Sequence, residues 1–208
     1  MPPTLEEEMR LLGLGLLPAA GLDEVGRGCW AGPLVAAAVV LPVEALVLCP
    51  ERLSGVDDSK RLSARRREVL AGRIYEVALG VGLGVVSPAL VDALGIVRAT
   101  GLAMRRALAR LPLVPRFLLV DGRTALDLPF PQRLLVRGDA RCLSIAAASI
   151  VAKVYRDRWM VAWAERYPLY GFEKHKGYGT AGHRRALERW GPCPLHRRSF
   201  SPVRALGR

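Results

Sequence analysis

The chain has 208 residues, of which 51% are hydrophobic and 24% are charged. These proportions favour a globular protein with an ordinary core and exclude a chain that is disordered throughout. Thirty-one Lys and Arg against 19 Asp and Glu give a formal charge of +12, which favours a polyanionic partner, either nucleic acid or an anionic membrane surface. An arginine-rich composition with no function attached would give the same charge.

The cysteines and the N-terminal segment speak against secretion and membrane insertion. The four cysteines are widely scattered and show no zinc-binding spacing, so we expect no disulfide framework, no structural zinc and a reducing compartment. The apolar stretch from Leu11 to Ala20 follows three glutamates and is too short to span a bilayer. We interpret it as a helix on the domain, followed by a turn at Pro18. The expectation is a cytoplasmic monomer without membrane contact.

The chain from Gly21 onward predicts an antiparallel hairpin. Residues 21–25 are typical of a strand, the glycine-rich turn at 26–28 follows, and residues 34–41 are a β-branched and alanine-rich run between two prolines. Two strands joined by so short a connection pair in antiparallel fashion.

Helical and strand patterns alternate after the hairpin, which indicates an α/β fold. Strands are expected at 81–86, 117–120 and 134–136, and helices at 62–77, from Pro88 to about 111, at 144–163 and at 181–190. Pro168 and Gly171 end the long third helix. No repeat or linker is visible, so residues 1–208 are interpreted as one domain whose residues from about 168 form a small C-terminal helical appendage.

Four acidic residues are candidates for a two-metal nuclease centre: Asp23, Glu24, Asp121 and Asp139. Metal-assisted phosphodiester hydrolysis needs several carboxylates around two divalent ions, and oxygen ligands select hard ions such as Mg²⁺ or Mn²⁺. Three of these positions lie at or near strand ends, where distant segments can meet. Because neighbours in a regular strand face opposite sides of a sheet, Asp23 and Glu24 require either a distorted strand or a carboxylate that reaches around its end.

Each acid taken alone has a simpler interpretation. A lone Asp is more often a helix cap, a turn residue or a surface ion-pair partner, and Asp121-Gly122 is a common turn dipeptide. Composition and spacing by themselves therefore predict only a possible metal-dependent nuclease.

A series of ordered motifs extends over nearly the whole chain and is similar to the ribonuclease HII family. The string GLDEVGRG at 21–28, followed by Ala31-Gly32-Pro33, resembles the family's opening signature. The other blocks occur in the family's order: Asp58-Ser59-Lys60, Val120-Asp121-Gly122, Gly138-Asp139, IAAASIVAK at 145–153, Arg156-Asp157-Arg158, His175-Lys176-Gly177-Tyr178 and LHRRSF at 195–200. Seven ordered blocks after the signature are far more specific than any one alone.

The resemblance implies a ribonuclease H-like mixed five-stranded sheet flanked by helices, with its first three strands antiparallel. It implies an endonuclease that hydrolyses the RNA strand of RNA/DNA hybrids and cuts at ribonucleotides embedded in duplex DNA, leaving 5′-phosphate and 3′-hydroxyl ends. By the same resemblance, the four acids bind metal and Tyr178 stacks at the junction with the following deoxyribonucleotide. Backbone groups of Gly26, Arg27 and Gly28 then read the ribose 2′-hydroxyl, and Lys60 and Lys153 lie near the phosphates.

Simpler interpretations remain beside the implied roles. The loop at 26–28 is also compatible with a plain hairpin connection, Tyr178 with a core aromatic and Lys153 with a solvated helix charge. Cys29-Trp30 stands where the family often has small or aliphatic residues, and Val25 replaces the more usual alanine.

Two rival functions keep the same fold: a noncatalytic basic nucleic-acid-binding protein, and a DNA-directed nuclease that would not need a 2′-hydroxyl reader. Basic helix faces at 61–73 and 98–110 are expected to hold the duplex backbone.

Overall fold

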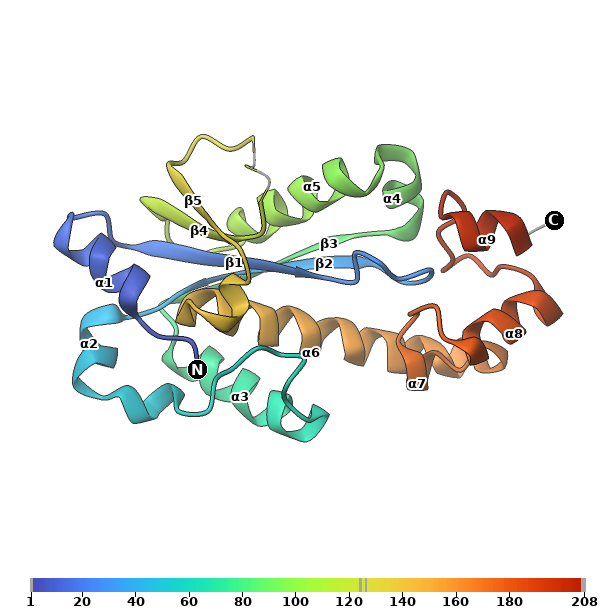
Figure 1. The fold of residues 1–208 in the computed structure, drawn as a ribbon, viewed down its shortest axis with the longest axis horizontal. Helices are drawn as coiled ribbons and strands as arrows, with labels where there is room; N and C mark the ends of the chain where they lie inside the picture. Colours follow the sequence, from blue (N-terminus) through green and yellow to red (C-terminus); the bar gives the residue numbers. More distant parts are fainter. Residues whose placement is uncertain (1, 124, 126, 207–208) are drawn as a thin grey trace.

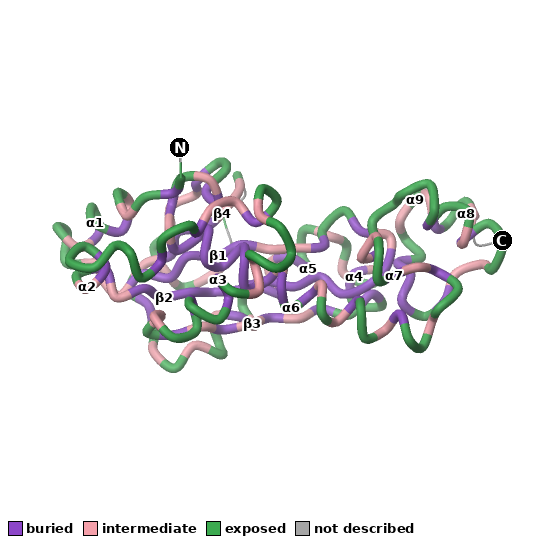
Figure 2. The backbone as a smooth tube through the Cα atoms, turned by 90° about the horizontal axis from the view of Figure 1, so that it is seen from below, coloured by how far each residue is buried: buried purple, intermediate pink, exposed green. Residues whose placement is uncertain are grey.

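A computed structural model describes residues 2–123, 125 and 127–206. It consists of a central sheet between two helical layers, with a group of small C-terminal helices beyond one end of the sheet (Figure 1). The tube view shows that buried backbone is concentrated in the sheet and in the long helix beneath it (Figure 2). This architecture confirms the predicted α/β class.

The sheet has five strands in the order β3-β2-β1-β4-β5. The strands are β1 (Ala19–Val25), β2 (Leu34–Val40), β3 (Gly80–Val86), β4 (Phe117–Asp121) and β5 (Gln132–Leu135). β1, β2 and β3 pair in antiparallel fashion, whereas β4 and β5 run parallel to β1. The predicted hairpin and the mixed sheet are both confirmed.

Helices cover both faces of the sheet because its buried strands are apolar on both sides. α3 (Ala64–Val77) and α6 (Leu143–Arg166) pack on one face, and α4 (Pro88–Leu94) and α5 (Ile96–Leu108) pack on the other. Gly84 of β3 lets α5 approach closely, since a Cβ at this position would collide with the carbonyl oxygen of Ala103. Two separate cores result, one on each side of β2.

Two sequence-based expectations about helices are wrong in their placement. The N-terminal helix is α1 (Glu6–Gly13), and the apolar residues that follow it form a turn before β1 instead of a helix. The buried Glu8 explains the shift, because its carboxylate accepts hydrogen bonds from Ser144 N at 2.8 Å and from Cys142 Sγ at 3.1 Å at the start of α6. The helix expected from Pro88 to 111 is divided by Gly95, which has a φ of 73°.

Short helices complete the chain. α2 (Val43–Leu48) and η1 (Pro50–Leu53) follow β2 and were not anticipated, and η2 (Gly138–Ala140) precedes α6. Beyond α6 lie η3 (Pro168–Tyr170), α7 (Phe172–His175), α8 (Ala181–Trp190) and α9 (Ser201–Leu206). Residues of η3, α7 and the tail at 193–195 pack with Ala31 and the end of α6 in a core of their own. This C-terminal group therefore stands next to the loop that joins β1 to β2.

Candidate active site

The candidate acids lie where the three parallel strands end. β1 carries Asp23 and Glu24 near its carboxyl end, Asp121 is the last residue of β4, and Asp139 lies in η2, four residues after β5. Carboxyl ends of neighbouring parallel strands meet at one sheet edge, which is where open α/β sheets place their sites. The topology thus brings together residues that are more than a hundred positions apart.

Asp23 and Glu24 do face opposite sides of the sheet, as a regular strand requires. Pairing with β2 continues without a bulge from Ala20 to Val25, whereas pairing of β1 with β4 ends at Leu22. β1 therefore extends beyond its parallel neighbour, and both carboxylates can reach the open edge from their own faces. Because the strand is regular here, the carboxylates meet by reaching around its end and not through a distortion of the strand.

Nine of the ten residues singled out in the sequence line one cavity of about 240 Å³, which we call the carboxylate cavity. Its lining also includes Ser59 and Ser149, which the sequence analysis missed because serine carries no comparable signal. The nine are Asp23, Glu24, Gly26, Arg27, Gly28, Lys60, Asp121, Lys153 and Tyr178. The tenth, Asp139, is buried and contacts the cavity through Lys60, whose Nζ lies 3.2 Å from its Oδ2.

Raised pKa values characterise the carboxyl groups carried by β1 and β4. Burial is the main cause of the raised pKa of Asp23, Glu24 and Asp121. For Asp23 the pKa lies well above its usual range, because Glu24, Asp121 and Asp139 add like charge to a carboxyl that is only 5% exposed. A cluster of this kind favours the binding of cations.

Hydrogen bonds hold the acids in place. Asp23 Oδ1 accepts from the Glu24 amide at 2.7 Å, and Asp121 Oδ1 accepts from the Gly138 amide at 2.7 Å. The second bond links the end of β4 to the segment that carries Asp139. Arg27 contributes an ion pair, with its Nη1 3.3 Å from Glu24 Oε1.

The donor set suits a hard divalent cation, because it consists of carboxylates only. Across the part of the chain that the structure describes, no three His, Cys, Asp or Glu side chains lie close enough to enclose one ion. The positively charged ammonium group of Lys60 instead lies beside Asp139. Partial burial lowers the pKa of Lys60, but the nearby carboxylates of Asp139, Asp58 and Asp23 raise it, and the net shift is upward.

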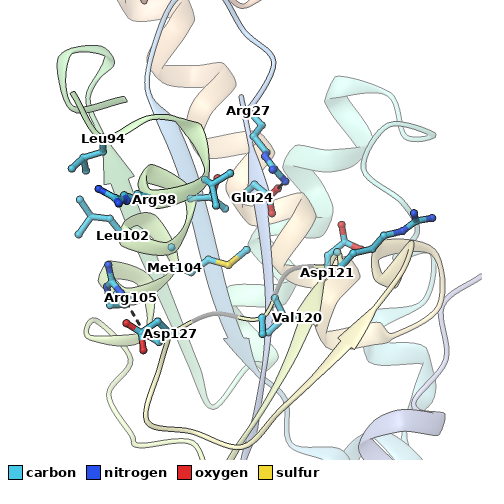
Figure 3. Close-up of a pocket in the computed structure, with 16 residues that line it drawn as sticks. Glu24, Arg27, Leu94, Arg98, Leu102, Met104, Arg105, Val120, Asp121 and Asp127 are labelled. Atoms are coloured by element: carbon cyan, nitrogen blue, oxygen red, sulfur yellow. Dashed lines mark hydrogen bonds and ion pairs between the residues drawn. The ribbon is translucent and has the colours of Figure 1, made fainter. Parts of the chain in front are cut away.

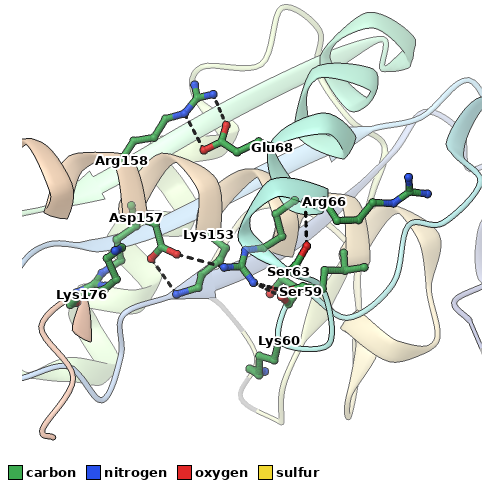
Figure 4. Close-up of polar contacts among 12 residues, drawn as sticks. Ser59, Lys60, Ser63, Arg66, Glu68, Lys153, Asp157, Arg158 and Lys176 are labelled. Carbon is green, nitrogen blue, oxygen red and sulfur yellow. Dashed lines mark hydrogen bonds and ion pairs between the residues drawn. The ribbon is translucent and has the colours of Figure 1, made fainter. Parts of the chain in front are cut away.

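The two lysines are positioned by polar contacts between α3 and α6 (Figure 4). Lys153 Nζ lies 2.8 Å from Asp157 Oδ1, and Arg67 Nη2 lies 3.6 Å from the other oxygen of the same carboxylate. Arg67 also donates to the Ser59 carbonyl at 2.9 Å, which holds the loop that carries Lys60. Lys153 is therefore oriented from both helices.

The loop at 26–28 requires its first glycine. Gly26 has a φ of 87°, and a Cβ there would collide with the buried side chain of Arg156. Around Gly28, by contrast, a Cβ would meet nothing within 4 Å, so its backbone faces open space. An exposed main chain at the cavity rim is what close contact with a sugar requires.

Two buried arginines support this loop, and the sequence analysis assigned neither of them a role. Arg156 donates to the carbonyls of Pro33, Lys176 and Ala31 at 2.8–2.9 Å. Arg197 donates to the carbonyls of Gly32 and Arg27 at 2.9–3.1 Å. Burial lowers the pKa of Arg197 to about 10. Both lie in motif blocks, but nothing in a sequence tells a buried arginine from a surface one.

Tyr178 lies at the cavity with 40% of its surface exposed, so it is not the core aromatic of the simpler interpretation. Lys153 Nζ is 5.5 Å from the ring centroid, and the guanidinium of Arg156 is 5.9 Å from it. Burial of its hydroxyl raises the pKa of Tyr178 to about 12. Trp30 packs nearby against His183, with ring centroids 5.5 Å apart.

A second cavity of about 540 Å³ adjoins the site on the α5 face (Figure 3). Glu24 and Asp121 lie on one side of it and the α5 residues Arg98 and Leu102 on the other. Arg106 of α5 and Arg110, just beyond the end of that helix, donate at 2.6 Å to carbonyls of the edge strand β3. These two arginines are thus engaged with the sheet, although the sequence suggested a basic face for the duplex.

Comparisons with known proteins agree with the geometry. Residues 20–203 match a family model described as Ribonuclease HII. A Ribonuclease HII from Roseiflexus castenholzii is 53% identical over 202 residues, which cover 97% of this chain and 90% of the relative. The crystal structure of the ribonuclease H2 from Pyrococcus horikoshii superimposes with a TM-score of 0.76 at 25% identity, covering 91% of this chain and 96% of that one.

A third neighbour shows similarity of fold alone. The crystal structure of Bst-RNase HIII in complex with Mn²⁺ superimposes with a TM-score of 0.74 at 21% identity, covering 91% of this chain and 68% of that one. In the described ranges, none of the helices has the length and apolar character needed to cross a membrane.

Proposed function

Because the chain belongs to the ribonuclease HII family, with the endoribonuclease activity on RNA/DNA hybrids and embedded ribonucleotides that membership implies, we propose that its carboxylate cavity is the active site. The observation that carries this proposal is the convergence of nine predicted residues on one cavity at the ends of the parallel strands. The expected products carry 5′-phosphate and 3′-hydroxyl ends.

We assign Asp23, Glu24, Asp121 and Asp139 as the groups that hold divalent metal, Mg²⁺ or Mn²⁺. The raised pKa values of Asp23, Glu24 and Asp121 and the mutual repulsion of the cluster support the assignment, because bound cations would neutralise it. A related fold has been crystallised with Mn²⁺. When bound, such ions activate water and stabilise the leaving oxygen.

The remaining residues of the cavity have assigned roles in recognising substrate. The backbone at 26–28 contacts the ribose 2′-hydroxyl, and the Tyr178 ring stacks on the sugar of the nucleotide that follows. Lys153 and Lys60 line the same cavity and neutralise phosphate. The exposed backbone at Gly28 and the exposed Tyr178 ring support this assignment.

A cleavage assay on a duplex with a single embedded ribonucleotide tests the function. Wild-type protein is expected to cut beside the ribonucleotide only when Mg²⁺ or Mn²⁺ is added, and Asp121→Asn and Asp139→Asn are expected to lose most of that activity. An all-DNA duplex of the same sequence serves as the control. Binding without cleavage in either ion would favour the noncatalytic rival, and cleavage of the all-DNA duplex would favour the DNA-directed one.

A further inference from the structure

The three histidines of the chain form one cluster beneath the loop that carries Tyr178. His175 ends α7, His183 lies in α8 and His196 lies in the tail before α9. The rings of His175 and His183 stack with centroids 4.3 Å apart, and those of His183 and His196 are 5.2 Å apart. His183 and His196 are fully or almost fully buried.

The hydrogen-bond partners fix which nitrogen of His196 carries the proton. The Cys193 amide can only donate, and it lies 3.0 Å from His196 Nδ1, closer than the Cys193 carbonyl oxygen at 3.3 Å, so Nδ1 accepts from the amide. The proton of a neutral His196 is therefore on Nε2, which lies 3.0 Å from His183 Nε2. His196 donates across this contact and His183 accepts.

The same logic fixes His183 and His175. With its Nε2 accepting, a neutral His183 carries its proton on Nδ1, which lies 2.9 Å from the Tyr178 carbonyl oxygen and donates to it. His175 Nε2 lies 2.7 Å from the Tyr170 carbonyl oxygen and donates, while His175 Nδ1 accepts from the Gly177 amide at 3.1 Å. All six ring nitrogens have compatible partners only when the three rings are neutral.

This chain of bonds ends on the backbone of the Tyr178 loop, where the backbone needs support. Lys176 has a positive φ of 50°, which is unfavourable for a residue with a side chain, so the turn that delivers Tyr178 gains from outside support. The Tyr178 carbonyl accepts from His183 and also from the Thr180 amide at 2.8 Å. Its ring remains exposed at the carboxylate cavity.

We propose that His183, with its proton directed by His196, is a positioning residue that fixes Tyr178 for recognition of the ribonucleotide junction. The inference rests on the proposed role of Tyr178 and adds to it the group that orients the ring. His183 touches no substrate. It acts by donating to the carbonyl of the tyrosine that does.

Two substitutions at His183 separate donation from packing. Asn places an amide N–H where Nδ1 stands, whereas Gln places its amide where Nε2 stands and leaves the Tyr178 carbonyl without that donor. We expect His183→Asn to keep near wild-type kcat/KM on a single-ribonucleotide duplex and His183→Gln to lose about fivefold, the loss of one neutral hydrogen bond. If packing alone matters, the larger Gln should do at least as well as Asn, which would overturn the proposal.

The Tyr178→Ala background makes the test specific. A residue that acts through the Tyr178 ring has nothing to position once the ring is gone, so the Asn and Gln variants should become equal there. A persisting difference overturns the positioning role but leaves the role of Tyr178 intact. If Tyr178→Ala by itself leaves junction cleavage unchanged, the proposed role of Tyr178 fails, and this inference with it.

One measurement on the wild-type protein needs no variant. Nitrogen-15 NMR of the histidine rings at neutral pH is expected to show three neutral rings, with His183 protonated at Nδ1 and His196 and His175 at Nε2. Protonation of His183 at Nε2 would overturn the proposal even if every variant failed to fold.

Discussion

The carboxylate cavity and the region that supports it handle buried charge in opposite ways. In the cavity, Asp23 is buried among like charges and its pKa is raised well above the usual range. Behind the cavity, Arg156 and Arg197 are just as buried, but their guanidinium groups donate to backbone carbonyls. The carboxylates of the cavity thus still favour the binding of cations, whereas the buried arginines of the supporting region already have hydrogen-bond partners within the protein.

Of the substitutions that this comparison suggests, we expect the one at Asp23 to have the largest effect on activity. We expect Asp23→Asn to lower cleavage about 100-fold or more, since metal-supplied stabilisation is worth several kcal/mol. The same substitution should keep or raise the melting temperature of the metal-free protein, because it removes like-charge repulsion. Both are measured on one preparation, with the exposed Glu165→Gln as the control for loss of a carboxylate. A lower melting temperature together with full activity would show that Asp23 is structural.

The opposite result is expected at Arg197. Arg197→Met removes the donors to the Gly32 and Arg27 carbonyls and leaves these buried groups unsatisfied, which should cost about 3 kcal/mol of unfolding free energy. For a chain of this size this corresponds to a fall in melting temperature of roughly 6 to 12 °C. Arg198→Met, at the exposed neighbouring position, is the matched control. Equal melting temperatures for the two variants would contradict the supporting role.

Lowering the pH should also distinguish the two regions, because their titrating groups change the free energy of unfolding in opposite directions. Burial lowers the pKa of His183 and His196 to about 4, below the ordinary 6.5, so the unfolded chain takes up protons first as the pH falls. These two groups therefore reduce the free energy of unfolding between pH 6.5 and 4, while the raised pKa of Asp23 acts in the opposite direction. Urea unfolding at pH 7 and pH 5 measures the sum.

The histidine contribution is isolated by comparison with His196→Gln, which should lose less stability on acidification than the wild type. The nearby positive charge of Arg198 lowers the pKa of His196 further. An identical loss in both proteins would show that these rings do not titrate in this range.

The sequence predicted the strands and their antiparallel start well, but it predicted poorly which residues support the site from behind. The hairpin and the acids at strand ends follow from local patterns, and the ordered motifs identify the family. The placement of α1 depends on a contact between Glu8 and the start of α6, 136 positions away, which no local pattern carries. The roles of Arg156 and Arg197 depend equally on long-range hydrogen bonds, and those of the histidines depend on how the C-terminal segments pack together, so burial had to be seen before these residues could be interpreted.

The smallest expected effect concerns the basic helix faces, where the structure divides what the sequence treated alike. Arg65 on α3 is exposed, whereas Arg106 on α5 donates to the Val85 carbonyl at the edge of β3. If Arg65 contacts a phosphate, Arg65→Ala should reduce the slope of log binding constant against log salt by about 0.9, the counterion released per contact on a duplex. Arg106→Ala should leave that slope unchanged and lower stability instead, because it exposes the strand edge. Binding titrations on the hybrid between 50 and 200 mM salt measure the slopes. A reduced slope for Arg106→Ala alone would place the duplex on the α5 side and would move the phosphate-binding face to the opposite layer of the sheet.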